Sequence, residues 1–130
     1  MSTNSTMRTP LKNVRRLGSA KEGADHFWKQ RLTGVANLAL SVFLIWLLAT
    51  LVGADHAQVK ATLGSPLVSL PLLLLIGSAM IHMRLGMQTI IEDYVHGEGT
   101  KVVCLMLNTF FAIIVGAASA FAVLRLTLGA

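Results

Sequence analysis

His82 is the residue of this sequence best placed to do chemistry, because it is a titratable ring inside a long apolar stretch. If that stretch crosses a membrane, an ionisable side chain there is costly and by default indicates a functional site. Neutral imidazole is a common ligand of metals and of haem iron. The alternative is a histidine that only hydrogen-bonds a neighbouring helix. Position alone leaves both interpretations open.

Three residues that follow at helical spacing extend this candidate site. Gly86 is one turn along the same face, and Asp93 returns to within about 20° of it. Tyr94 comes next, at the end of the apolar stretch. The glycine gives room for a flat ring or for close helix packing. The acid and the phenol could bind and protonate a polar headgroup, or could be ordinary solvated side chains at a membrane boundary.

Other residues of the same stretch are expected to pack. Met80, Met83 and Met87 fall about 100–160° round the helix from the histidine, so we interpret them as packing residues and not as axial ligands. Arg84 lies on the far side, where it either snorkels toward the interface or contacts a partner protein.

Three apolar stretches, at about 32–52, 67–91 and 102–125, must position these residues. Each is close to the roughly 20 residues that cross a bilayer. The hydrophobic content of 54% also exceeds that of ordinary soluble domains. In lipid a helix satisfies its own backbone polar groups, whereas an open strand does not. The sequence therefore predicts an all-α integral membrane protein with three transmembrane helices, joined by polar connectors at 53–65 and 92–101.

Basic residues gather before the first apolar stretch. Residues 1–31 hold seven lysines and arginines, whereas the first connector holds only Lys60. By the positive-inside rule the N-terminus is expected in the cytoplasm and the C-terminus in the periplasm. We therefore divide the chain into a basic cytoplasmic segment with an interfacial lead-in at 1–31 and a three-helix transmembrane anchor at 32–130. Nucleic acid is not an expected partner, because little of the chain could build a folded basic surface.

The two flanking stretches each carry a stripe that repeats every four residues. Such stripes favour close packing in lipid. The stripe of the first apolar stretch is polar and consists of Thr33, Asn37 and Ser41. The stripe of the third apolar stretch is made of small residues, Ala112, Gly116 and Ala120.

Two segments, HMRLG at 82–86 and DYVHGE at 93–98, resemble the second transmembrane helix of a known family. This is the succinate dehydrogenase hydrophobic membrane anchor, a component of respiratory complex II, in its alphaproteobacterial form. The family pattern is a histidine, a glycine four residues later, and an Asp-Tyr pair eleven and twelve residues later. The likeness extends to the three helices and the basic N-terminus.

The resemblance implies roles for individual residues. His82 would be one axial ligand of a haem b, with Gly86 as a gap facing the haem. Tyr94 would hydrogen-bond a ubiquinone carbonyl, and Asp93 would support that site. Arg31 would lie near the haem propionates. The second haem ligand would come from a partner, the second membrane anchor subunit of the complex.

The rest of the chemistry is expected in other chains. The three remaining histidines lie outside the apolar stretches, so a six-coordinate bis-histidine haem needs a second chain. The chain has no dinucleotide-binding motif and one cysteine, too few for an iron–sulfur cluster. FAD and the clusters are therefore expected in a flavoprotein subunit and an iron–sulfur subunit, and no catalytic residue is expected in this chain alone.

The leading hypothesis is a membrane anchor subunit of succinate:ubiquinone oxidoreductase in the bacterial inner membrane. It would help bind haem b and ubiquinone and pass electrons from succinate oxidation to the quinone pool. One alternative is the anchor of a fumarate reductase, which the quinone type of the source membrane would distinguish. The other is a non-redox three-helix helper protein, which predicts no haem absorbance in the purified complex.

Overall fold

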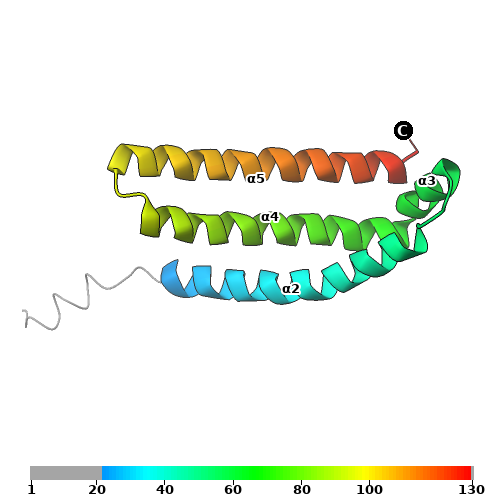
Figure 1. The fold of residues 1–130 in the computed structure, drawn as a ribbon, viewed down its shortest axis with the longest axis horizontal. Helices are drawn as coiled ribbons and strands as arrows, with labels where there is room; N and C mark the ends of the chain where they lie inside the picture. The colour runs from blue at the N-terminus through cyan, green and yellow to red at the C-terminus, as the bar shows by residue number, and fades with distance from the viewer. Residues whose placement is uncertain (1–21, 130) are drawn as a thin grey trace, which may run out of the picture.

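The computed structural model describes residues 22–129, and these form four helices and no strand (Figure 1). The helices are α2 (Glu22–Thr50), α3 (His56–Gly64), α4 (Pro66–Tyr94) and α5 (Glu98–Thr127). The predicted all-α class is confirmed. Most of the basic segment predicted at 1–31 lies outside the described residues.

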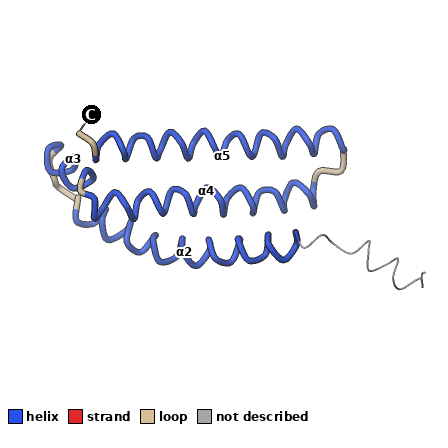
Figure 2. Tube along the Cα trace, turned by 180° about the vertical axis from the view of Figure 1, so that it is seen from behind, coloured by secondary structure: helices blue, strands red, loops and turns tan. Residues whose placement is uncertain are grey.

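The three long helices lie side by side in one layer, with α4 in the middle (Figures 1 and 2). Helix α4 packs along α2 on one side and along α5 on the other, and within residues 22–129 α2 makes no close backbone contact with α5. A single layer buries few side chains. The buried apolar residues of the described part are Leu47, Leu85, Ile91 and Ala112. Both broad faces of the layer are therefore open to lipid or to other protein.

All three long helices can cross a membrane. The candidate spans are Gly23–Thr50, Pro66–Tyr94 and Glu98–Thr127. At 1.5 Å per residue each exceeds the roughly 30 Å of a bilayer's hydrocarbon core. The three predicted transmembrane helices are confirmed, and the direction in which they cross stays a prediction.

The helices are longer than the apolar stretches that predicted them. Helix α2 begins at Glu22 and not near residue 32, because the charged and aromatic lead-in is part of the same helix. Helices α4 and α5 extend into the second connector and leave only 95–97 between them. The predicted connector at 92–101 was too long, since hydropathy marks the lipid-facing part of a helix and not its polar ends.

Helix α3 was not predicted, because the composition of 53–65 indicates only a polar connector. The chain leaves α2 through Gly53, whose φ of 80° favours glycine. Asp55 then caps α3: its carboxylate accepts a hydrogen bond from the Gln58 backbone N–H at 2.7 Å, and the Asp55 N–H donates to Gln58 Oε1 at 3.3 Å. This reciprocal capping box was the available signal in the sequence.

The end of α3 sits directly on the backbone of α5. A Cβ built at Gly64 would lie 2.8 Å from the carbonyl oxygen of Leu126. We expect Gly64→Ala to destabilise the protein by about 1–3 kcal/mol, because a backbone atom cannot swing aside. The measurement is the thermal midpoint of the detergent-purified complex. Gly77→Ala is the control, since nothing lies within 4 Å of its Cβ position. Equal midpoints for the two variants would contradict this account of α3.

Small and flexible side chains join α4 to α5. A Cβ at Gly116 would lie 3.0 Å from Met80 Cγ, and Ala112 is only 5% exposed. Met83 and Met87 line a groove of about 420 Å³ between the two helices. Packing between α4 and α5 is thus confirmed for Met80 and for the small residues Ala112 and Gly116, whereas Met87 is 43% exposed.

Candidate functional site

His82 lies in the seam between α4 and α2. Its Nδ1 is 3.1 Å from Thr33 Oγ1 and 3.2 Å from the backbone carbonyl oxygen of Gln30. The Thr33 hydroxyl itself donates to the backbone carbonyl of Lys29 at 2.7 Å. The hydroxyl oxygen can therefore accept from the ring, and a proton on Nδ1 satisfies all three groups. The helices thus favour the tautomer of His82 that is protonated at Nδ1.

That tautomer leaves the lone pair on Nε2. Within residues 22–129 the hydrogen bonds of His82 all go through Nδ1. Ligating histidines commonly donate their other ring N–H to a backbone carbonyl, which fixes the orientation of the ring. The chemistry of the seam therefore fits a histidine that ligates iron through Nε2.

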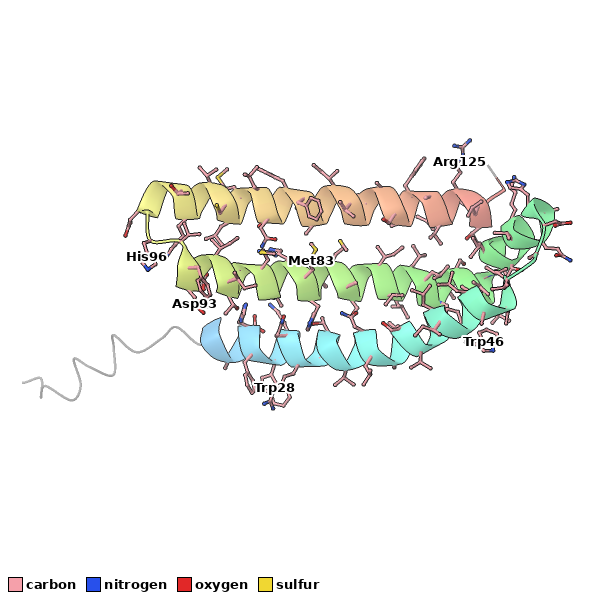
Figure 3. All side chains as sticks on the ribbon, viewed as in Figure 1. Trp28, Trp46, Met83, Asp93, His96 and Arg125 are labelled. Atoms are coloured by element: carbon pink, nitrogen blue, oxygen red, sulfur yellow. The ribbon has the colours of Figure 1, made fainter. Side chains whose placement is uncertain are left out.

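Polar groups line the seam beyond His82, and Figure 3 shows nitrogen and oxygen atoms meeting between α2 and α4. The Ser78 hydroxyl donates to the Thr33 carbonyl at 3.2 Å. Three buried atoms have no hydrogen bond in the described part: His26 Nε2, Gln30 Oε1 and Asn37 Oδ1. Buried polar atoms are normally paired with protein or water. The seam therefore has capacity for water, a ligand or another chain.

Two glycines let the seam close. A Cβ at Gly86 would lie 3.3 Å from Gln30 Nε2, and a Cβ at Gly34 would lie 3.4 Å from His82 Cε1. Of the two uses that the sequence left open for Gly86, the structure has close helix packing. Its role as a gap facing a haem stays a prediction.

Asp93 and Tyr94 occupy the last turn of α4, and Asp93 is labelled in Figure 3. Both are exposed, Tyr94 to 77%, and neither has a partner among the described residues. At 1.5 Å per residue Asp93 lies roughly 16 Å and Tyr94 roughly 18 Å along the helix from His82. Residues 22–129 do not enclose the pair in a pocket.

Arg31, predicted near the haem propionates, lies on α2 with its guanidinium over the Phe27 ring, 4.2 Å from the centroid. Its side chain is exposed, and the propionate role stays a prediction. No group of three or more histidine, cysteine or acidic residues that could hold a metal ion occurs within residues 22–129. A haem shared between two chains needs only one ligand from this one.

Comparison with known proteins decides the family. The model of the succinate dehydrogenase/fumarate reductase transmembrane subunit family matches residues 5–124. The chain belongs to this family. It is accordingly a succinate dehydrogenase membrane anchor, a multi-pass protein of the bacterial inner membrane that works with other subunits of the complex. Family membership removes the alternative of an unrelated helper protein.

Curated relatives cover most of the chain. The succinate dehydrogenase hydrophobic membrane anchor subunit of Paracoccus denitrificans is 33% identical over 94% of both chains. The corresponding subunit of Rickettsia bellii is 28% identical over 82% of this chain and 86% of its own. The membrane anchor subunit of Reclinomonas americana is 32% identical over 72% and 80%. No solved structure gives a significant match.

Sequence reasoning missed part of the site of this family member. It selected Thr33 from the polar stripe, and the structure places that hydroxyl on His82. It did not select Gln30 or Gly34, which also contact the ring or its neighbours. The signal available was the spacing of His26, Gln30, Thr33 and Asn37, which repeats every three to four residues along one helix face.

Proposed function

We propose that this chain ligates a haem b through His82 Nε2 and, with its partner subunits, forms the site where ubiquinone is reduced by electrons from succinate. The observation that supports this most directly is the pairing of Nδ1 with the Gln30 carbonyl and the Thr33 hydroxyl, because Nε2 of this membrane-helix residue then has no hydrogen bond within residues 22–129. When bound, the haem supplies one-electron chemistry. The chain's contribution is to hold and orient its ligand.

The open layer supports the need for partners. Residues 22–129 leave both broad faces of the three apolar helices uncovered, and they give no hydrogen bond to the buried polar atoms of the seam. We propose that the second membrane anchor of the complex covers part of this surface and brings the second haem ligand. FAD and the iron–sulfur clusters belong to the flavoprotein and iron–sulfur subunits.

The proposed quinone-binding site includes the last turn of α4. In the proposal the Tyr94 phenol donates a hydrogen bond to a ubiquinone carbonyl, and the Asp93 carboxylate beside it supports the site. Both side chains are exposed where α4 ends, so a partner chain can close a pocket over them. Arg31 is proposed to contact the haem propionates.

The proposed function is tested by deleting this chain and restoring it. Membranes without it should lose succinate-dependent ubiquinone reduction, whereas succinate oxidation by a soluble dye should persist in the released hydrophilic subunits. Expression of the full chain should restore the quinone activity. Unchanged quinone reduction in the deletion would contradict the proposal. Assay with a low-potential quinone and fumarate measures the reverse direction, which the family description also covers.

Thr33 offers a test of how His82 is oriented. Thr33→Val removes the hydroxyl 3.1 Å from Nδ1 and keeps the side-chain shape. We expect haem affinity to fall roughly tenfold or more. Removing a hydrogen-bond partner of a ligating histidine typically lowers metal affinity about 10–100-fold. Thr33→Ser keeps the hydroxyl and should retain haem. The measurement is haem content per complex during detergent washing. A valine variant that holds haem as firmly as the serine variant would contradict this role.

A further inference from the structure

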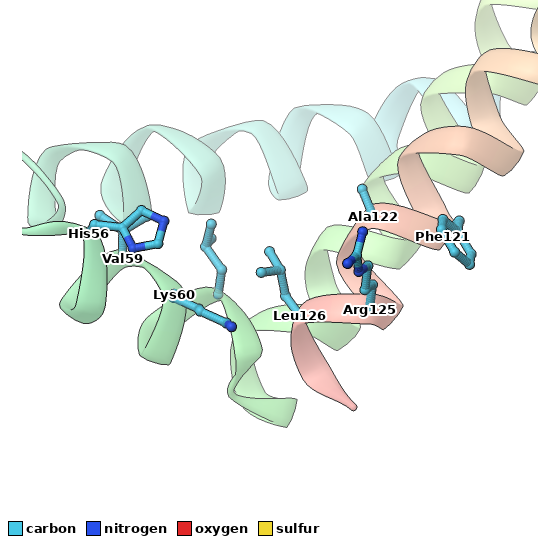
Figure 4. Close-up of a pocket in the computed structure, with 8 residues that line it drawn as sticks. His56, Val59, Lys60, Phe121, Ala122, Arg125 and Leu126 are labelled. Atoms are coloured by element: carbon cyan, nitrogen blue, oxygen red, sulfur yellow. The ribbon is translucent and has the colours of Figure 1, made fainter. Parts of the chain in front are cut away.

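A groove lies at the end of the layer opposite Tyr94, between α3 and the last two turns of α5 (Figure 4). Its volume is about 540 Å³. The α3 residues face those of α5 across it, and Gly64 fixes the distance between the two helices by its contact with the α5 backbone. The packing of α3 against α5 therefore sets the width of the groove.

The lining combines positive charge with an apolar floor. His56 and Lys60 come from α3 and Arg125 from α5, and no acidic side chain of residues 22–129 lines the groove. Asp55, next to His56, is engaged in capping α3. The remaining lining residues are apolar: Val59, Leu63, Phe121, Ala122 and Leu126. An occupant should therefore carry both an anionic group and a hydrocarbon part.

The position of the groove along the membrane span matches such an occupant. Arg125 lies in the last turn of α5, which is the end of the candidate span Glu98–Thr127. Phe121 lies one turn further into the span and is exposed. Cations at the end of a span stand at headgroup level, and apolar residues one turn deeper face the hydrocarbon.

We propose that this groove binds an anionic phospholipid of the surrounding bilayer. The phosphodiester would accept hydrogen bonds from Lys60 and Arg125, with His56 beside them, and an acyl chain would lie over Phe121 and Leu126. Lysine and arginine side chains form charge-assisted hydrogen bonds with phosphate oxygens. A free phosphate ion would leave the apolar floor unused, which favours the lipid. This site is independent of the haem and quinone proposal.

The test uses the whole complex, purified through this chain and delipidated in detergent. Phosphatidylglycerol, phosphatidylcholine and inorganic phosphate are titrated separately, and bound lipid is counted by native mass spectrometry. The double variant Lys60→Gln/Arg125→Gln should bind phosphatidylglycerol roughly tenfold or more weakly, since each cation near an anionic headgroup contributes on the order of 1 kcal/mol. The charge-preserving pair Lys60→Arg/Arg125→Lys should bind as wild type does. Lys101→Gln, which removes one positive charge at the other end of α5, should also bind normally.

Lys60→Gln alone provides a test if the double variant does not assemble, because Lys60 is exposed on α3. It should weaken phosphatidylglycerol binding severalfold. Unchanged phosphatidylglycerol affinity in the glutamine variants overturns the proposal. So does equal affinity for phosphatidylcholine in the wild type, or displacement of the lipid by millimolar inorganic phosphate. Loss of partner subunits with unchanged lipid binding would assign the groove to a protein contact and also overturn it.

Discussion

His82→Ala is expected to remove or loosen the haem of the complex, with haem per complex falling tenfold or more. The alanine deletes the imidazole whose Nε2 is the proposed iron ligand. No other described histidine can take its place on α4: His56 and His96 lie outside the α2–α4 seam, and His26 lies on α2, one turn before Gln30. A haem held by a partner ligand alone is also expected to show a shifted spectrum. The measurement is haem content by pyridine haemochrome together with the reduced visible spectrum.

A second histidine supplies the matched control for this substitution. His96 is exposed in the three-residue connector between α4 and α5, so His96→Ala should leave the haem and its spectrum unchanged. If His82→Ala keeps a normal haem band, His82 is not the ligand. The seam contacts of its Nδ1 would then serve only to join α2 to α4.

Tyr94→Phe is expected to lower kcat/KM for ubiquinone roughly tenfold to a hundredfold while haem content stays normal. A hydrogen bond to a group that gains charge is worth about 1.5–3 kcal/mol, which corresponds to that loss of rate. The fold should not suffer, because Tyr94 is 77% exposed and the change removes only its hydroxyl. The measurement is succinate:ubiquinone reductase activity of the purified complex, beside succinate oxidation with a soluble dye.

Neighbouring carboxylates give a matched pair for the same site. Asp93→Asn should also impair quinone reduction, whereas Glu92→Gln should not, since Glu92 is engaged with Gln88 Nε2 at 2.8 Å on its own helix. Normal quinone kinetics in Tyr94→Phe would remove Tyr94 from the quinone site. It would leave the haem proposal standing, because Tyr94 and His82 lie roughly 18 Å apart along α4.

The three long helices followed from the sequence because lipid imposes one strong constraint: a long apolar stretch must be a helix. Helix α3 was not predicted because it is short and polar, so neither its hydropathy nor an apolar face indicated a helix. Asp55 and Gln58 form a capping box, a sequence pattern that indicates a helix N-terminus but does not affect hydropathy.

For the candidate site, too, the sequence predicted the arrangement within one helix and did not predict the contacts between helices. The spacing of His82, Gly86 and Asp93 within one helix was readable, because helical geometry fixes which residues share a face. The contacts of His82 with Gln30 and Gly34 were not, because they depend on which face of α2 meets α4. Tyr94 is exposed and residues 22–129 form no pocket over it, so the proposed quinone site depends on contacts that helical spacing within α4 does not describe.

The most direct test of haem ligation by this chain is the reduced-minus-oxidised visible spectrum of the wild-type complex purified through it. We predict a b-type band corresponding to one haem per copy of this chain, with the haem retained through detergent exchange. Absence of the band from an assembled complex that still oxidises succinate would contradict haem ligation. His82 would then be a polar group that ties α4 to the Thr33 and Gln30 positions of α2.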